Sequence, residues 1–294
     1  MKAAIDCGAN STRLLIIDER GIEVERRSVV TGLGSFAERV ETRVARTLDV
    51  LASFRATADA VGATIRAVGG SALRGALDND EFLRSATDVL GVQPVVLSGA
   101  DEARLAFVCA TGDLSFHEGD GPYVVIDIGG GSCQFAVGRA GVFENAFSID
   151  TGCLRVGEEF WEFDPPGPVA LSQAISVVHA HLDDVDRELP SVKEASRAVG
   201  VGGSILTAAA IELGAYDAAR IHHFGLTREA AEDVFRTVAT EARADRAFNP
   251  GLAPDRVDTI VAGTLILVTA MRHFGWSSCL VSDRDLLYGV LADW

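Results

Sequence analysis

The sequence predicts an α/β protein of two related domains. Its 294 residues are enough for two domains that each bury a core of their own. Extended and helical segments alternate along the chain, which is typical of an α/β fold. A strand–aspartate–turn–strand pattern occurs near the N-terminus and again near the middle of the chain. The two similar hairpins indicate that one domain was duplicated.

The first half begins with two apolar runs, at residues 2–6 and 11–18, that flank turn residues at 7–10. This arrangement predicts a β-hairpin. Helical spacing of apolar residues predicts a helix over 40–61. Further strands are expected at 64–68 and 93–97, and further helices at 80–90 and 101–110. Ser98 is a candidate N-cap for the last of these helices.

Residues 112–121 are polar and contain several glycines, so they predict a domain boundary. We expect domains at 1–117 and 118–294. In the second domain we expect a hairpin at 123–138, strands at 142–149, 197–201 and 279–282, and helices at 154–162, 170–188, 202–213, 228–242, 255–274 and 285–292. Thr227 is the predicted N-cap of the helix at 228–242.

Charge and composition exclude several protein classes. The net charge is −16, from 26 Lys and Arg against 42 Asp and Glu, whereas a nonspecific nucleic-acid binder is normally basic. No apolar run reaches the roughly 18 residues of a membrane span, and the N-terminus lacks the apolar core of a signal peptide. We therefore expect a cytoplasmic protein that binds neither nucleic acid nor membrane.

Zinc and a disulfide framework are not expected, because the cysteine count is odd and no pair has CxxC spacing. The sequence places cysteines at positions 7, 109, 133, 153 and 279. We expect small buried thiols at these positions. His222 and His223 are adjacent, but no nearby Cys, His or Asp spacing supports a metal site there, so they are interpreted as packed or surface histidines.

The two hairpins match in register at a constant offset of 121 residues, so that Asp6 corresponds to Asp127 and Ser11 to Ser132. Glycines in such a turn let backbone N–H groups approach a ligand, and consecutive N–H groups form a concave site for phosphate oxygens. A strand-end aspartate suits a hydrated divalent cation. Either turn alone could be an ordinary hairpin with a capping aspartate, but two turns in register favour a ligand site.

The duplicated DxGxxS hairpin and the later segment VGVGGSILT resemble the actin-like ATPase superfamily. The narrower similarity is to exopolyphosphatases and guanosine-pentaphosphate phosphohydrolases (the Ppx/GppA family). Four further stretches carry it, at residues 70–74, 98–105, 149–166 and 256–263. The resemblance implies two actin-like (ribonuclease H-like) domains in the short, two-domain form of the family. Each would be a mixed β-sheet flanked by helices, with a cleft between the domains, and the last helix is a candidate to pack back on the first domain.

The resemblance also implies roles for particular residues. Glu102 falls on the family's catalytic glutamate, the general base, and Arg74 on a cationic clamp for phosphate. Without the resemblance, Glu102 would be interpreted as a helix-dipole residue and Arg74 as a solvated surface arginine. Asp127 and Asp6 are the expected ligands of Mg²⁺ or another divalent cation. The expected phosphate-binding residues are Asn10, Ser11, Gly129, Gly130, Gly131, Ser132, Gly202, Gly203 and Ser204. The last three open a helix, although a close packing turn would also explain them.

This sequence departs from the family pattern at several positions. The family's GGGSTE hairpin has Gln134 in place of its glutamate, and glutamine brings no negative charge. The family's RLG reads GLG at residues 32–34, and its LREG reads LLYG at residues 286–289. These changes weaken the transfer of activity more than the transfer of fold.

The sequence is consistent with three alternative functions. The first is Mg²⁺-dependent hydrolysis of a terminal phosphoanhydride in polyphosphate or guanosine pentaphosphate. The second is a weakly active or inactive regulator that binds polyphosphate or guanosine penta- or tetraphosphate, favoured by Gln134. The third is an actin-like sugar or acetate kinase, for which only the generic glycine motifs are present. Homodimers are common in the family, but the sequence contains no dimer signature.

Overall fold

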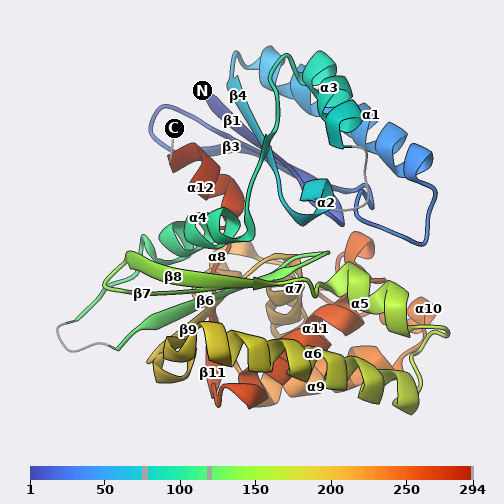
Figure 1. Cartoon of the computed structure of the whole chain (residues 1–294), viewed down its shortest axis with the longest axis vertical. Helices are drawn as coiled ribbons and strands as arrows, with labels where there is room; N and C mark the ends of the chain where they lie inside the picture. The colour runs from blue at the N-terminus through green and yellow to red at the C-terminus, as the bar shows by residue number, and fades with distance from the viewer. Residues whose placement is uncertain (75–78, 118–120, 293–294) are drawn as a thin grey trace.

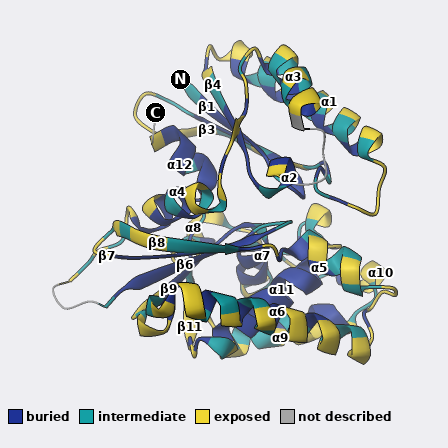
Figure 2. Ribbon diagram, viewed as in Figure 1, coloured by how far each residue is buried: buried dark blue, intermediate teal, exposed yellow. Residues whose placement is uncertain are grey.

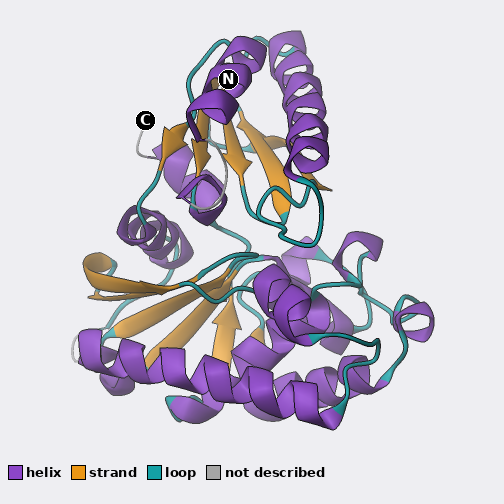
Figure 3. Ribbon diagram, turned by 45° about the vertical axis from the view of Figure 1, so that its right-hand side comes forward, coloured by secondary structure: helices purple, strands orange, loops and turns teal. Residues whose placement is uncertain are grey.

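The computed structural model describes residues 1–74, 79–117 and 121–292, which form two lobes with one β-sheet each (Figure 1). The N-terminal lobe holds a five-stranded sheet and the other lobe a six-stranded sheet. Figure 3 shows helices covering both sheets and loops converging where the lobes meet. The predicted α/β architecture with two mixed sheets is confirmed.

The strand order repeats between the two sheets. In the first sheet the order is β3-β2-β1-β4-β5, and in the second it is β10-β11-β9-β6-β7-β8. Each sheet contains an antiparallel three-stranded meander, β1-β2-β3 or β6-β7-β8. A strand then adds in parallel beside the first strand of that meander, β4 beside β1 and β9 beside β6. This shared topology agrees with the duplication inferred from the two hairpins.

The strands of the first sheet are β1 (Lys2–Cys7), β2 (Ser11–Ile17), β3 (Glu23–Val30), β4 (Thr64–Gly69) and β5 (Val95–Val96). Those of the second are β6 (Tyr123–Ile128), β7 (Cys133–Arg139), β8 (Val142–Ile149), β9 (Arg197–Val201), β10 (Gly225–Thr227) and β11 (Ser278–Val281). The sequence did not predict β3 because this edge strand is mostly polar and no residue of it is buried. It did not predict β10 because three residues are too few to show a period.

The helices are α1 (Val40–Ala60), α2 (Ser71–Arg74), α3 (Asn79–Leu90), α4 (Gly99–Thr111), α5 (Cys153–Phe160), α6 (Pro168–Glu188), α7 (Gly203–Leu213), α8 (Ala218–Ile221), α9 (Arg228–Thr240), α10 (Arg243–Arg246), α11 (Ile260–His273) and α12 (Leu286–Ala292). Two 3₁₀ helices cover Pro190–Glu194 and Pro254–Arg256. The expected helix at 255–274 begins only at Ile260. The residues before it form the 3₁₀ turn that Pro254 starts, and the N–H of Thr259 bonds the carbonyl of Arg256. The helices α2, α8 and α10 have four residues each and were not predicted.

Both faces of each sheet are covered, as Figure 2 shows by the dark, buried ribbon between the layers. Helices α1 and α3 share a core with one face of the first sheet, and α12 packs on its other face. Helices α6, α7 and α11 share a core with one face of the second sheet, and α4 covers the opposite face. Thus α12 comes from the end of the chain to cover the first sheet, while α4 leaves the first lobe to cover the second.

The predicted caps are confirmed. Ser98 and Asp101 form a reciprocal capping box at the start of α4, and the Thr227 hydroxyl accepts a hydrogen bond from the N–H of Ala230. The predicted boundary at 117/118 adjoins residues 118–120, which lie outside the described residues. All five cysteines are buried and free, as expected. None of the helices in the described part of the chain has the length and hydrophobicity needed to span a membrane.

Candidate active site

The turns of the two repeated hairpins contact each other where the lobes meet. A Cβ atom added to Gly130 would lie 2.8 Å from the backbone nitrogen of Asn10, and one added to Gly131 would lie 3.2 Å from the Cβ of Ala9. The glycines of the β6–β7 turn therefore let the β1–β2 turn approach it closely. A similar constraint holds behind the turn, where a Cβ on Gly152 would lie 2.4 Å from the carbonyl of Gly130. Close backbone approach at these glycines therefore shapes the point where the two turns meet.

Two adjoining cavities open at this meeting point. The inner cavity has a volume of about 80 Å³, and the outer pocket one of about 540 Å³. Ala9, Ser71 and Gly130 line both, so the two lie side by side. The predicted site residues that line the inner cavity are Asp6, Asn10, Ser11, Glu102, Asp127, Gly129, Gly130, Ser132, Gly202, Gly203 and Ser204. The other two, Arg74 and Gly131, line the outer pocket. The fold thus brings together every site residue predicted from sequence.

The hairpin registers place a polar partner opposite each repeated aspartate. Asp6 pairs with Arg13 across β1 and β2, and Asp127 pairs with Gln134 across β6 and β7. Because Arg13 and Gln134 occupy equivalent positions of the repeat, the two halves have diverged at this point. In one half an arginine balances the aspartate, and in the other an uncharged amide faces it.

Arg13 holds Asp6 with two hydrogen bonds. Its Nη2 lies 2.7 Å and its Nε 3.0 Å from Asp6 Oδ2, while its Nη1 lies 2.6 Å from Asp285 Oδ2. Asp6 Oδ1 is buried and has no hydrogen-bond partner. Burial raises the pKa of Asp6, partly opposed by Arg13. One oxygen of this carboxylate is therefore committed to Arg13, and the other remains available to a ligand.

No side chain among the described residues donates a hydrogen bond to Asp127. Burial raises its pKa to about 6, with the neighbouring Asp285 and Asp6 adding to the effect and Arg13 opposing it. Gln134 turns instead to two hydroxyls, with its Nε2 2.7 Å from Ser132 Oγ and 3.2 Å from Ser148 Oγ. A half-buried carboxylate that receives no side-chain hydrogen bond has unused capacity to bind a cation.

Glu102 lies in the first turns of α4 and reaches the inner cavity over Gly70. A Cβ at Gly70 would lie only 1.8 Å from Glu102 Oε1, so only glycine leaves room for this carboxylate. Arg74, at the end of α2, donates from Nη1 to Glu102 Oε2 at 2.8 Å. Burial raises the pKa of Glu102 to about 7. Arg74 opposes this rise, and the negative charges of Asp6 and Asp127 add to it.

The N-terminus of α7, which follows strand β9, lies close to Asp127. Gly202 has φ +93°, and a Cβ there would lie 2.7 Å from Asp127 Oδ1. Both the conformation and the close approach require glycine. The expected packing role of this turn is therefore real. It does not conflict with the expected anion-binding role, since Gly202, Gly203 and Ser204 all line the inner cavity.

Sequence reasoning missed several residues of the site. Arg13 could have been found from the hairpin register, but Asp285 is 272 residues away from it in sequence. Arg256 lines the inner cavity, and its guanidinium lies 2.5 Å from the position of a Cβ on Gly203. The sequence analysis included Arg256 only as the first residue of the 256–263 stretch and assigned it no role in the site. Arg43 and Arg155 line the outer pocket, and no local pattern distinguishes them from surface arginines.

Known proteins similar to this chain were found by sequence and by structure. A model of the Ppx/GppA phosphatase family matches residues 9–294. The chain is 32% identical to Exopolyphosphatase 2 of Mycobacterium tuberculosis, over 98% of this chain and 96% of that protein. It is 27% identical to the guanosine-5′-triphosphate,3′-diphosphate pyrophosphatase of Aeromonas salmonicida, over 99% of this chain and 59% of that protein. The crystal structure of the Aquifex aeolicus Ppx/GppA family member aligns with a TM-score of 0.80 at 27% identity, over 99% of this chain and 96% of that one.

Proposed function

The chain belongs to the Ppx/GppA phosphatase family, and we propose that it hydrolyses the terminal phosphoanhydride bond of inorganic polyphosphate or guanosine pentaphosphate. The observation that carries the proposal is the position of Glu102. This carboxylate, with its pKa raised to about 7, faces the turns of both hairpins inside a small cavity. A general base with a pKa near the working pH combines a useful deprotonated fraction with adequate basicity.

Glu102 would accept a proton from a water molecule in the inner cavity. The water oxygen then bonds to the terminal phosphorus, while the bond from phosphorus to the bridging oxygen breaks and the electron pair leaves with the shortened chain. Arg74 holds Glu102 at 2.8 Å and has further N–H groups for a phosphate oxygen. The hairpin N–H groups and the N-terminus of α7 would stabilise the negative charge of the transferred phosphoryl group. Phosphoryl transfer depends mainly on such positioning and charge stabilisation.

The residues present fit a hard divalent cation such as Mg²⁺. Asp6 Oδ1 is buried without a partner, the Asp127 carboxylate receives no side-chain hydrogen bond from the described residues, and both line the inner cavity. Carboxylate oxygens and water are the ligands that Mg²⁺ prefers. Asp127 would be the principal ligand and Asp6 a second one, direct or through water. When bound, the cation would neutralise phosphate charge and lower the cost of placing two carboxylates together.

The outer pocket would hold the rest of the substrate. Its lining includes the guanidinium-bearing residues Arg43, Arg74 and Arg155 and the exposed ring of Phe36. Glu158 on α5 accepts hydrogen bonds from Ser35 and from the N–H of Phe36, so both lobes build its wall. Exopolyphosphatase 2 of Mycobacterium tuberculosis matches this chain over 96% of its own length, which supports polyphosphate as the preferred substrate.

The alternative is a weakly active or inactive phosphate-binding regulator. Gln134 supports it, because this amide is fixed by Ser132 and Ser148 at the position facing Asp127 and provides no charge. The hydrolase is favoured because Glu102, Arg74 and Asp127 all remain and meet in one site.

The test is phosphate release from short-chain polyphosphate and from guanosine pentaphosphate with Mg²⁺. We expect release by the wild type and a loss of about 10²–10⁴-fold in Glu102→Gln, the range typical of a lost general base. Glu159→Gln, at an exposed position of α5, is the matched control. Binding of both substrates without release by the wild type would support the regulator and contradict the hydrolase.

A further inference from the structure

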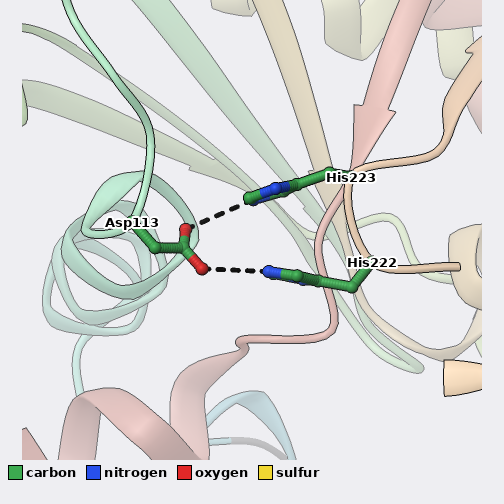
Figure 4. A group of neighbouring side chains, drawn as sticks. All are labelled: Asp113, His222 and His223. Atoms are coloured by element: carbon green, nitrogen blue, oxygen red, sulfur yellow. Dashed lines mark hydrogen bonds and ion pairs between the residues drawn. The ribbon is translucent and has the colours of Figure 1, made fainter. Parts of the chain in front are cut away.

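Two adjacent histidine rings stack beside the second sheet, outside the site described above. His222 follows α8 and His223 follows it directly. Their ring centroids are 3.9 Å apart, with an angle of 27° between the planes. Asp113, just after α4, faces the edges of both rings (Figure 4). Its Oδ2 lies 2.9 Å from His222 Nε2, and its Oδ1 lies 3.3 Å from His223 Nε2. The sequence showed no ligand near the histidines because Asp113 is 109 residues away from His222.

The three donor atoms have the spacing that a small cation requires. One ligand atom from each residue can be chosen so that all lie within 4.8 Å of one another. In a tetrahedral site with bonds of about 2.0–2.2 Å, neighbouring ligand atoms are about 3.3 Å apart. The separations of 2.9 Å and 3.3 Å involve different oxygens of Asp113, so the carboxylate meets one ring with each oxygen. All three side chains are partly exposed, which gives an ion access and leaves a position for water.

A second carboxylate orients the first ring. His222 Nδ1 lies 2.8 Å from Asp283 Oδ1, in the connection that leads to α12. Both nitrogens of His222 therefore face carboxylates. The backbone N–H of Asp283 also lies 3.4 Å from His222 Nδ1, and Arg284 Nε lies 3.1 Å from Asp113 Oδ2, so a guanidinium already faces the first carboxylate. A ring that donates Nδ1–H to a carboxylate presents its Nε2 lone pair, which is the common arrangement of metal-binding histidines.

The backbone at His223 is held in an uncommon conformation. Its φ is +63°, in the left-handed region, and its N–H donates to the carbonyl of Val281 at 2.7 Å. Histidine enters this region more readily than most residues, but the conformation still costs free energy. It stacks the second ring on the first at an angle of 27°, with both Nε2 atoms toward Asp113. Strain that aligns two potential ligands is typical of ligand-binding positions.

We propose that Asp113, His222 and His223 bind one divalent transition-metal ion of the zinc type, with water completing the coordination. Imidazole nitrogens with one carboxylate suit such ions better than Mg²⁺, which prefers oxygen ligands. The ion would join the end of α4 to the loop before β10 and, through Asp283, to the connection leading to α12. Arg284 limits the affinity, because its Nε lies 3.1 Å from Asp113 Oδ2 and brings positive charge to the same oxygen.

The test is titration of chelator-treated, dialysed full-length protein with Zn²⁺, followed by calorimetry, in excess Mg²⁺ to occupy all-oxygen sites. Cobalt(II) absorption reports the coordination independently. We expect one zinc-binding event in the wild type. His222→Gln and His223→Asn should weaken it by more than 10-fold, and Asp283→Asn by about 10–100-fold as an outer-shell change. Asn suits the left-handed backbone at position 223. Arg284→Ala should bind more tightly, a gain that general destabilisation would not produce.

Controls separate this site from a second group of metal-binding side chains. Asp183, Asp186 and His273 also come together, and Lys193 Nζ pairs with Asp186 Oδ2 at 2.6 Å as Arg284 pairs with Asp113 in the first group. The second group has one histidine where the first has two, so it offers fewer imidazole ligands to an ion of the zinc type. Zinc binding that survives in His222→Gln and His223→Asn but disappears in His273→Asn would overturn the proposal. So would an absence of zinc binding by the wild type. His181→Gln should bind as the wild type does, and thermal melts without metal confirm that each variant is folded.

Discussion

Replacing Glu102 by glutamine should stabilise the fold at the same time as it removes activity. The side chain is mostly buried, and burial raises its pKa from 4.5 to about 7. The unfolded carboxyl group loses its proton near pH 4.5, whereas the folded one keeps it until about pH 7. Between these values the folded state binds more protons, so the free energy of unfolding falls as the pH rises.

The magnitude follows from the size of this pKa shift. Each pKa unit corresponds to about 1.36 kcal/mol, so an ionised Glu102 costs the folded protein about 3 kcal/mol above pH 7. The pKa of about 7 already includes the hydrogen bond and charge of Arg74, which favour the ionised form, so no separate term is subtracted for that bond. The expected stabilisation by glutamine is therefore about 3 kcal/mol at pH 8. It should vanish near pH 4.5, where the wild-type carboxyl is also neutral.

The assay is urea unfolding at pH 8 and pH 4.5, without Mg²⁺ or substrate, monitored by tryptophan fluorescence. Glu159→Gln, on the exposed side of α5, is the control and should change stability little at either pH. A Glu102→Gln protein that is less stable than the wild type at pH 8 would refute the reasoning. An equal gain at both values would show that packing, rather than charge, is responsible.

Four further predictions follow from the site. Gly70→Ala should lower kcat by about 10²-fold with the fold retained by circular dichroism, because the new Cβ displaces Glu102; unchanged kcat would contradict its placement. Gln134→Glu should lower the Mg²⁺ concentration for half-maximal phosphate release by about 10-fold, since it adds charge facing Asp127; a higher requirement would argue against a metal there. Arg13→Met should cost about 3–5 kcal/mol in urea unfolding at pH 8, because it leaves the buried Asp6 without an ion-pair partner and Asp285 with Arg26 alone; a neutral effect would show that the ion pairs are not stabilising. In wild type, kcat/KM for polyphosphate should rise through about pH 7 as Glu102 ionises, and a flat profile from pH 6 to 8 would exclude it as the base.

Local patterns were sufficient for most of the fold. Alternation and turn residues predicted the hairpins that carry Asp6 and Asp127, and a period of 3.6 predicted helices such as α1 and α6. The same reasoning failed at β3, an edge strand whose side chains are mostly solvated and so show no apolar alternation. It also placed the start of α11 too early, because an apolar period does not reveal that Pro254 opens a separate 3₁₀ turn.

The sequence by itself determined the paired hairpins and hence which glycines, aspartates and serines line one cavity, because register and turn chemistry act over a few residues. Tertiary structure alone decided the partners of these residues. Arg13 meets Asp285 across 272 positions, Arg74 meets Glu102, and Asp113 meets His222 only because α4 crosses to the second sheet. Burial depends on the whole packed chain, so the raised pKa of Glu102 could not be predicted from its neighbours in sequence. The chemistry of the site depends on the packing of two lobes that no local pattern describes.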